Sequence, residues 1–351
     1  MGPYRLAAAA LAAGITACGL PLTGQDPLGE SPDSGGSLDA PSDGATVVGP
    51  DGSTGPTGPR DGGGSIDGPS SVADGPAGGG ACDANLSSDP AHCGTCDRDC
   101  AGGSCQSGSC LPAAIASSPD PIRAVGISST YIVWATVAQQ IYRAALDGSG
   151  TQPIASTNDG VSELVVDGTD IYYTTGDLHR ITIDGASDTV LVTGGADACL
   201  QISGTTAYVV AGSSVPVSID AVDLTAGTRT PVVPAADLLL PWGVAVTAGD
   251  VYWSGNQHGD PDGGLWHLPL AGGSANEIVP HLANPNCLTV YGDALFWPNS
   301  DDGTIMTSAL DGSGSRFLAT GQDTTYPPTT VAVDDRFVYW SSGKTIQRLA
   351  R

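Results

Sequence analysis

The sequence predicts an all-β fold, a six-bladed β-propeller, and three features of the chain carry that prediction. A unit with a period of about forty residues recurs six times between Ile122 and Arg351, and each copy consists of short apolar stretches and turns. Each copy holds an aromatic strand such as Val251-Tyr252-Trp253, and five copies place a turn rich in Asp and Gly after the next strand. Only three of the 37 acidic residues are glutamate and one residue is lysine, against 50 glycines, which is a composition of turns and not of helix faces. A repeat of this length made of strands and turns is typical of a propeller with one four-stranded blade per copy.

The strands of each copy can be placed in order. The second strand carries the aromatic residues, and its six instances are 131–134, 171–173, 208–210, 251–253, 295–297 and 338–340. The third strand has apolar residues two apart, and its six instances are 141–146, 178–183, 219–224, 265–270, 305–310 and 346–351. The sixth copy stops before its outer strand, and residues 112–117 match the missing pattern. We therefore expect an N-terminal strand to complete the last blade and to remove an exposed sheet edge.

The Tyr-Trp strand and the Leu-Asp-Gly-Ser-Gly turn resemble the YWTD propellers of lipoprotein-receptor ectodomains and the related six-bladed TolB-like and NHL-type propellers. This resemblance covers residues 112–351, within a propeller domain expected at 111–351. The YWTD tetrad itself is absent, and Tyr252-Trp253-Ser254-Gly255 is among its nearest matches. The resemblance implies the fold, whereas receptor function does not carry over, because many unrelated functions use this scaffold.

Residues 1–17 have the features of a lipoprotein signal peptide. One positive charge in 1–5 precedes an apolar run over 6–15, which is too short to span a membrane but suits a secretory signal. The following Ile15-Thr16-Ala17-Cys18 resembles the lipobox of bacterial lipoproteins, which implies that Cys18 becomes the acylated N-terminus. An ordinary secretory signal is the alternative. Residue 19 is glycine and not the aspartate that resembles an inner-membrane retention signal. We therefore expect a cell-envelope protein anchored in the outer membrane. The sequence does not determine whether it faces the periplasm or the cell surface.

Residues 18–81 are rich in Gly, Pro, Ser and Asp and have few large apolar side chains, so we expect a lipidated, disordered tether. The net charge of −25 argues against nucleic acid as a partner and against docking on anionic lipid. Contact with a membrane is therefore expected through the lipid anchor only.

Six of the nine cysteines gather in residues 82–110: Cys82, Cys93, Cys96, Cys100, Cys105 and Cys110. A segment this poor in apolar side chains holds a shape only through cross-links or a metal. Outside the cytoplasm disulfides are expected, and zinc at Cys93, Cys96 and the adjacent His92 is the alternative. The segment from Asp89 to Cys110 resembles the cysteine-rich module of stigma-specific proteins, and it suits a spacer or a small recognition unit. The spacing leaves the pairing open.

The other two cysteines, Cys199 and Cys287, begin inner strands in the third and fifth copies. An even count of eight cysteines after Cys18 favours a bond between them. The backbones of alternate blades are expected to lie too far apart for an unstrained bridge, so geometry favours two free thiols. We expect unpaired thiols.

Function is expected where the repeat is broken, and the largest departure is the loop over residues 255–264. The candidate binding face lies around the channel mouth and comprises Trp242, His258, Asp260, Asp262, His281, Asn286 and Tyr326. Aromatic rings with Asp and Asn suit a carbohydrate or peptide ligand. Asp260 and Asp262, with glycines beside them, are weak candidates for Ca²⁺, and no other cofactor is expected.

A lactonase or lyase is the enzyme alternative, because lactonases of similar fold hold a divalent cation through Glu, Asn and Asp. Glu163 and Asn286 begin inner strands and are weak candidates for such a site. The chain has no Gly-x-Ser-x-Gly elbow and no His-Glu-x-x-His motif, so no catalytic residue is assigned. We expect a module that binds a protein, peptide or glycan, with an enzyme or a purely structural envelope protein as alternatives.

Overall fold

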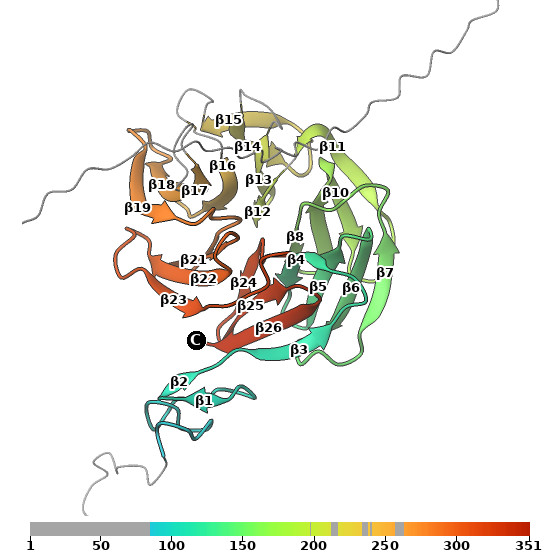
Figure 1. The fold of residues 1–351 in the computed structure, drawn as a ribbon. Coiled ribbons are helices and arrows are strands. Elements are labelled where there is room, and N and C mark those ends of the chain that lie inside the picture. Colours follow the sequence, from blue (N-terminus) through green and yellow to red (C-terminus); the bar gives the residue numbers. More distant parts are fainter. Residues whose placement is uncertain (1–84, 197, 212–216, 234–237, 239–240, 257–262) are drawn as a thin grey trace, which may run out of the picture. The chain divides into compact units, whose positions relative to one another are not determined.

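The computed structural model describes residues 85–351 except 197, 212–216, 234–237, 239–240 and 257–262. Across these residues the chain forms strands and turns and no helix. The described part of the chain therefore contains no helix long and apolar enough to cross a membrane. Six four-stranded antiparallel sheets surround a central channel, one sheet for each repeat (Figure 1). The predicted six-bladed propeller is confirmed.

Each blade runs in chain order from an inner strand beside the channel to an outer strand at the rim. Blade 1 contains β4 (Ile122–Ile127), β5 (Tyr131–Thr136), β6 (Gln140–Ala145) and β7 (Gln152–Ser156), and blade 2 contains β8 (Glu163–Asp167), β9 (Asp170–Thr174), β10 (Gly176–Thr182) and β11 (Thr189–Ala196). Blade 3 contains β12 (Leu200–Ser203), β13 (Thr206–Ala211), β14 (Ser218–Asp223) and β15 (Arg229–Val233), and blade 4 contains β16 (Pro241–Val246), β17 (Asp250–Asn256), β18 (Gly263–Pro269) and β19 (Asn276–Leu282). Blade 5 contains β20 (Thr289–Tyr291), β21 (Ala294–Asn299), β22 (Thr304–Ala309) and β23 (Arg316–Ala319).

Blade 6 takes its outer strand from the other end of the propeller. Its first three strands are β24 (Val331–Val333), β25 (Phe337–Ser342) and β26 (Thr345–Ala350), and the fourth is β3 (Ala113–Ser117). β3 pairs antiparallel with β26, so that Ser117 lies opposite Thr345, and the two strands lie side by side in Figure 1. The prediction that residues 112–117 complete the last blade is confirmed.

The hydrophobic core lies between neighbouring blades. Six clusters of buried residues each draw on two adjacent blades. In one of them Trp340 of blade 6 packs with Phe296 and Ile305 of blade 5, and the same cluster includes Cys93, Cys100 and Cys110 of the cysteine-rich segment. Four tryptophans of the second strands are the largest fully buried side chains: Trp134, Trp253, Trp297 and Trp340. Full burial of a large apolar side chain contributes about 1.5–3 kcal/mol, so these tryptophans stabilise four of the six blade junctions.

The repeated Asp-Gly turns also join neighbouring blades. Gly148 has a φ of 86°, and a Cβ atom there would overlap the backbone carbonyl of Ile115 in β3. Gly185 lies in the same way against Ile154 of the preceding outer strand. Glycine is therefore required in these turns for two reasons: it adopts the left-handed backbone conformation, and it leaves room for the neighbouring strand that touches it.

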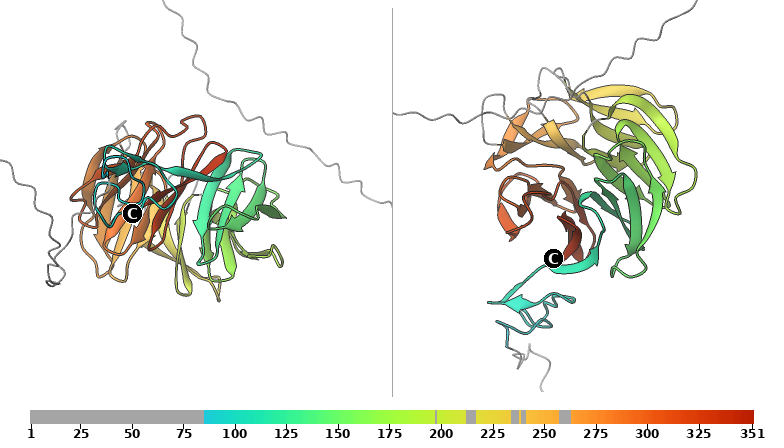
Figure 2. Two further views of the ribbon diagram at one scale, coloured as in Figure 1. Left: turned by 90° about the horizontal axis from the view of Figure 1, so that it is seen from below. Right: turned by 45° about the vertical axis from the view of Figure 1, so that its right-hand side comes forward.

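One side of the ring carries two sets of loops, and we call this side the top face. One set leads from each outer strand to the next inner strand, and the other joins second and third strands. The two sets bond to each other: the Ser300 N–H donates to the Asn284 carbonyl over 3.1 Å, and the Gly343 N–H donates to the Tyr326 carbonyl over 3.2 Å. In the turned views of Figure 2 the strands of the blades run between the two faces of the ring.

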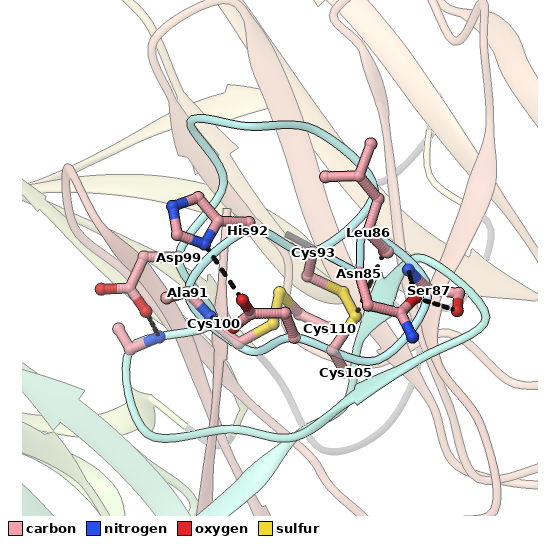
Figure 3. Close-up of a disulfide and its surroundings, with 12 residues drawn as sticks. Asn85, Leu86, Ser87, Ala91, His92, Cys93, Asp99, Cys100, Cys105 and Cys110 are labelled. Carbon is pink, nitrogen blue, oxygen red and sulfur yellow. Dashed lines mark hydrogen bonds and ion pairs between the residues drawn. A yellow bond between two sulfur atoms is a disulfide. The ribbon is translucent and has the colours of Figure 1, made fainter. Parts of the chain in front are cut away.

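The cysteine-rich module precedes β3 and contains one hairpin, β1 (Cys105–Gln106) with β2 (Ser109–Cys110). Two disulfides, Cys93–Cys105 and Cys100–Cys110, cross inside its loops (Figure 3). Cys96 is disulfide-bonded too, and Cys82 lies outside the described residues. Disulfides are therefore present in the segment where they were predicted. Cys93 and Cys96 are each disulfide-bonded, so neither offers the free thiolate that the alternative zinc site requires.

The module packs against the last blade. One Arg348 nitrogen donates to the Ala101 carbonyl over 2.9 Å, and another donates to the Leu146 carbonyl over 3.2 Å. The guanidinium also lies 4.4 Å from the centre of the Phe337 ring. Arg348 thus connects the module with blades 1 and 6 near the point where β3 closes the ring.

Candidate functional site at the mouth of the channel

The channel contains a cavity of about 370 Å³. Residues of five inner strands, β4, β8, β12, β20 and β24, line it, together with Cys287 and Thr330 just before the last two. Each inner strand is the edge of its sheet that faces the channel, so backbone N–H and C=O groups lie along these walls, and some of them already bond side chains of a neighbouring inner strand. No residue of β16 lines the cavity, which sets blade 4 apart from the other five.

Glu163, the first residue of β8, is the single ionisable group besides cysteine among the residues that line this cavity. Its side chain is buried, with 3% of the residue exposed. Oε1 accepts a hydrogen bond from the Leu164 N–H over 3.0 Å, and Oε2 is buried with no partner in the described structure. Burial raises the pKa of Glu163 well above its ordinary value, against a smaller opposing effect of the Leu164 N–H. Burial therefore favours the protonated form of the carboxyl group, which offers one O–H donor.

Cys199 and Cys287 form a disulfide, so the prediction of two free thiols is wrong. Their Cα atoms lie 5.5 Å apart, well inside the range for a bridge. The expected separation of alternate blades fails here because the inner strand of blade 4 carries a glycine, Gly243, at its third position. A Cβ at Gly243 would overlap the Asn286 carbonyl, so its absence lets the segment before blade 5 approach β16 and reach blade 3.

Side chains near the channel tie neighbouring inner strands together. The Thr330 hydroxyl accepts from the Val125 N–H over 2.9 Å, and the Thr289 hydroxyl donates to the Val331 carbonyl over 2.6 Å. Gln201 bonds both backbone groups of Val246. Further bonds of this kind join Thr174 to Ala198 and Ser254 to Asn286. The sequence assigned no role to these residues, although the place of Thr330, Thr289 and Gln201 at or near the start of an inner strand was a usable signal.

The structure places two predicted binding residues on either side of the disulfide. The Trp242 carbonyl accepts from the Cys199 N–H over 3.4 Å, and Asn286 directly precedes Cys287. The Trp242 side chain is 46% exposed and that of Tyr326, in the loop before blade 6, is 44% exposed. His281 lies in outer strand β19. His258, Asp260 and Asp262 lie outside the described residues.

The described residues fit a divalent cation poorly. Glu163 comes within 4.8 Å of the sulfurs of Cys199 and Cys287, and it is the only carboxylate of that group. The two sulfurs are bonded to each other, so neither is the thiolate that binds metals. A single buried carboxyl group does not supply the charge and the number of oxygens that Ca²⁺ requires.

No protein-family model and no curated protein sequence matches the chain. The solved structures to which it is similar include the complex of nidogen and laminin, at 18% identity and a TM-score of 0.50, over 60% of this chain and 83% of the other. A putative gluconolactonase is similar at 12% identity and a TM-score of 0.53, over 71% and 92% of the two chains. A Bacteroides thetaiotaomicron protein of unknown function is similar at 12% identity and a TM-score of 0.54, over 68% and 75%. At these identities the comparisons establish one thing, that the chain has the fold of a six-bladed β-propeller.

Proposed function

We propose that this protein is a lipid-anchored binding protein of the cell envelope, whose propeller holds an uncharged polar group of its ligand at the mouth of the channel. The observation that carries the proposal is Glu163, whose Oε2 is buried without a partner in a residue that lines the cavity. A buried donor without a partner costs about 1–3 kcal/mol, and a ligand that accepts its hydrogen bond would remove this cost.

The chemistry of the walls indicates the class of ligand. A neutral carboxyl group donates to a carbonyl or hydroxyl oxygen, and the free edges of the inner strands add backbone donors and acceptors. Trp242 and Tyr326, both exposed on the top face, are suited to stacking on a sugar ring or a peptide. A glycan or a peptide with one uncharged polar group that enters the channel fits all three features.

The location is proposed from the N-terminal sequence and is supported by the disulfides. The residues before Cys18 resemble a lipobox, and the described part of the chain holds the bonds Cys93–Cys105, Cys100–Cys110 and Cys199–Cys287. Such bonds persist in oxidising compartments such as the cell envelope. Labelling with a fatty acid should mark the wild-type protein and not Cys18→Ala, whereas unlabelled, fully soluble wild-type protein would contradict the lipid anchor.

The alternative is a metal-dependent lactonase, which is favoured by the fold shared with a putative gluconolactonase and by Glu163 in the channel. The burial of this carboxyl group, which favours its protonated form, and the lack of other carboxylates around it within the described residues argue for binding instead.

A glycan and peptide array, followed by two substitutions of Glu163, separates these functions. Glu163→Gln keeps a hydrogen-bond donor and should keep binding within a few-fold, whereas Glu163→Leu should weaken it by about tenfold or more, the usual effect of losing one buried hydrogen bond. Metal-dependent hydrolysis of lactones that disappears in Glu163→Gln would support the enzyme. Neither binding nor hydrolysis in the wild-type protein would leave a structural role in the envelope.

A further inference from the structure

A second property of the same region involves the disulfide and not the ligand. One carboxyl oxygen of Glu163 and the sulfurs of Cys199 and Cys287 all lie within 4.8 Å of one another. The acid and the two cysteines are buried, at 3%, 4% and 9% exposure. Cys287 lines the cavity, so a small molecule in the channel can reach the bridge from that side.

Reduction of a buried disulfide requires a proton as well as electrons. When a thiolate attacks one sulfur, the other sulfur leaves as a thiolate, and an isolated charge in an apolar site is strongly disfavoured. Among the described residues that line the cavity there is no Lys, Arg or His, so none of them supplies a cation to stabilise such a thiolate. A neutral carboxylic acid beside the sulfurs can remove the charge by giving up its proton.

We propose that Cys199–Cys287 is a redox-active disulfide that exchanges with small dithiols entering the channel, and that Glu163 is the proton donor to the leaving sulfur. The thiolate of the dithiol attacks Sγ of Cys287, the Cys287–Cys199 bond breaks, and Sγ of Cys199 takes the proton of Glu163. The second thiol of the reagent then attacks the mixed disulfide and releases Cys287, which takes up that thiol's proton. Glu163 regains a proton from water, so that one dithiol and one disulfide yield a cyclic disulfide and two cysteine thiols, with two electrons transferred.

The ring does not depend on this bond alone, which makes reversible reduction compatible with the fold. Cys199 and Cys287 join blades 3 and 5, which are not neighbours. Blade 4, between them, is tied to blade 3 by Gln201 and to blade 5 by Ser254 through hydrogen bonds to the backbone. Reduction would therefore free the segments at the channel mouth while the sheets remain closed.

The test compares disulfides within one molecule. The oxidised full chain is treated with dithiothreitol at several pH values, free thiols are trapped by alkylation, and reduction of Cys199–Cys287 is expressed relative to Cys93–Cys105 in the same sample. This ratio cancels the dependence of the reagent's own thiolate on pH. Glu163→Gln removes the proton donor, and Glu277→Gln makes the same chemical change at the other glutamate of the described residues, in outer strand β19.

We expect the ratio to fall about 10²-fold in Glu163→Gln, the usual contribution of a positioned general acid, and to stay unchanged in Glu277→Gln. In the wild-type protein the ratio should fall as pH rises through the elevated pKa of Glu163, because the ionised form has no proton to give. Equal ratios in wild type and Glu163→Gln, or a Cys199–Cys287 bond that is reduced only when the whole protein unfolds, would overturn the proposal.

Melting curves establish that Glu163→Gln is folded before it is compared. If it does not fold, Glu163→Asp replaces it, because aspartate keeps the acid one methylene further from the sulfurs. Its ratio should be lower than in the wild type and should still fall with rising pH, and a ratio independent of pH would contradict the role of the acid.

Discussion

The cysteine-rich module and the propeller are built from similar turn-rich sequence, yet different interactions hold them together. In the module, disulfides such as Cys93–Cys105 and Cys100–Cys110 span only 12 and 10 residues. In the propeller, six apolar clusters lie at the blade junctions, and the one disulfide spans 88 residues. Short cross-links can hold a segment that buries little apolar surface, whereas a ring of sheets is stabilised by burial between its repeats and by closure of its ends.

The largest effect should come from opening the ring. A chain that starts at Ser118 lacks β3, so blade 6 loses the ladder to β26 and the packing of Ile115 and Ala116. Lost hydrogen bonds at about 1 kcal/mol each suggest a cost of about 4 kcal/mol or more, which lowers the melting temperature by roughly 10 °C. The matched control starts at Leu111, lacks the module and keeps β3. Equal melting temperatures for the two chains would show that closure by β3 contributes little.

The second test compares the disulfides of the two regions. Replacing Cys199 and Cys287 together by alanine should destabilise the whole propeller by about 4 kcal/mol, because the bond closes a long loop. Replacing Cys93 and Cys105 should cost about 3 kcal/mol, and the loss should stay within the module. Hydrogen exchange resolves the two cases, since backbone amides of β5 or β17, which lie in blades 1 and 4, should exchange faster only in the first variant. Faster exchange there in the second variant would mean that the module supports the ring.

A third test separates the two roles of glycine in the repeated turns. Gly148 and Gly150 both have positive φ, at 86° and 67°, but only Gly148 touches the carbonyl of Ile115 in β3. Gly150→Ala should cost about 1 kcal/mol for the left-handed backbone alone. Gly148→Ala should cost clearly more in denaturant unfolding, because the added methyl group also separates blade 1 from blade 6. Similar losses for both variants would mean that the turn, and not the contact between blades, requires glycine.

The smallest effect concerns the buried acid and appears as a dependence on pH. The folded-state pKa of Glu163 is raised, so the folded protein keeps a proton that the unfolded chain has lost once the pH exceeds about 4.3. Stability therefore falls as pH rises from there to the folded-state pKa, by about 1.4 kcal/mol per pH unit from this group. Glu163→Gln lacks this contribution, so its melting temperature should gain on that of the wild type across the window. A difference that does not change with pH would contradict the buried neutral state.

The repeat by itself predicts much of this architecture. The aromatic stretches around Trp253 and Trp340 form second strands, as predicted. The sixth copy of the repeat lacks its outer strand, which indicated that residues 112–117 close the ring. These features are local or periodic: alternation places a residue on one face of a strand, and a missing strand is visible as an incomplete unit. The presence of disulfides in residues 82–110 followed from composition in the same way.

Tertiary structure alone decided the rest. The approach of Cys199 to Cys287 depends on Gly243 in a third blade, and the burial of Glu163 depends on cavity walls from four other blades. Contacts such as Gly148 with Ile115 likewise join segments that no local pattern connects. Periodicity determined which residues form each strand. Two features arise only when all six blades pack together. The backbone of one blade then touches the next blade, and the carboxyl group of Glu163 lies buried beside a disulfide.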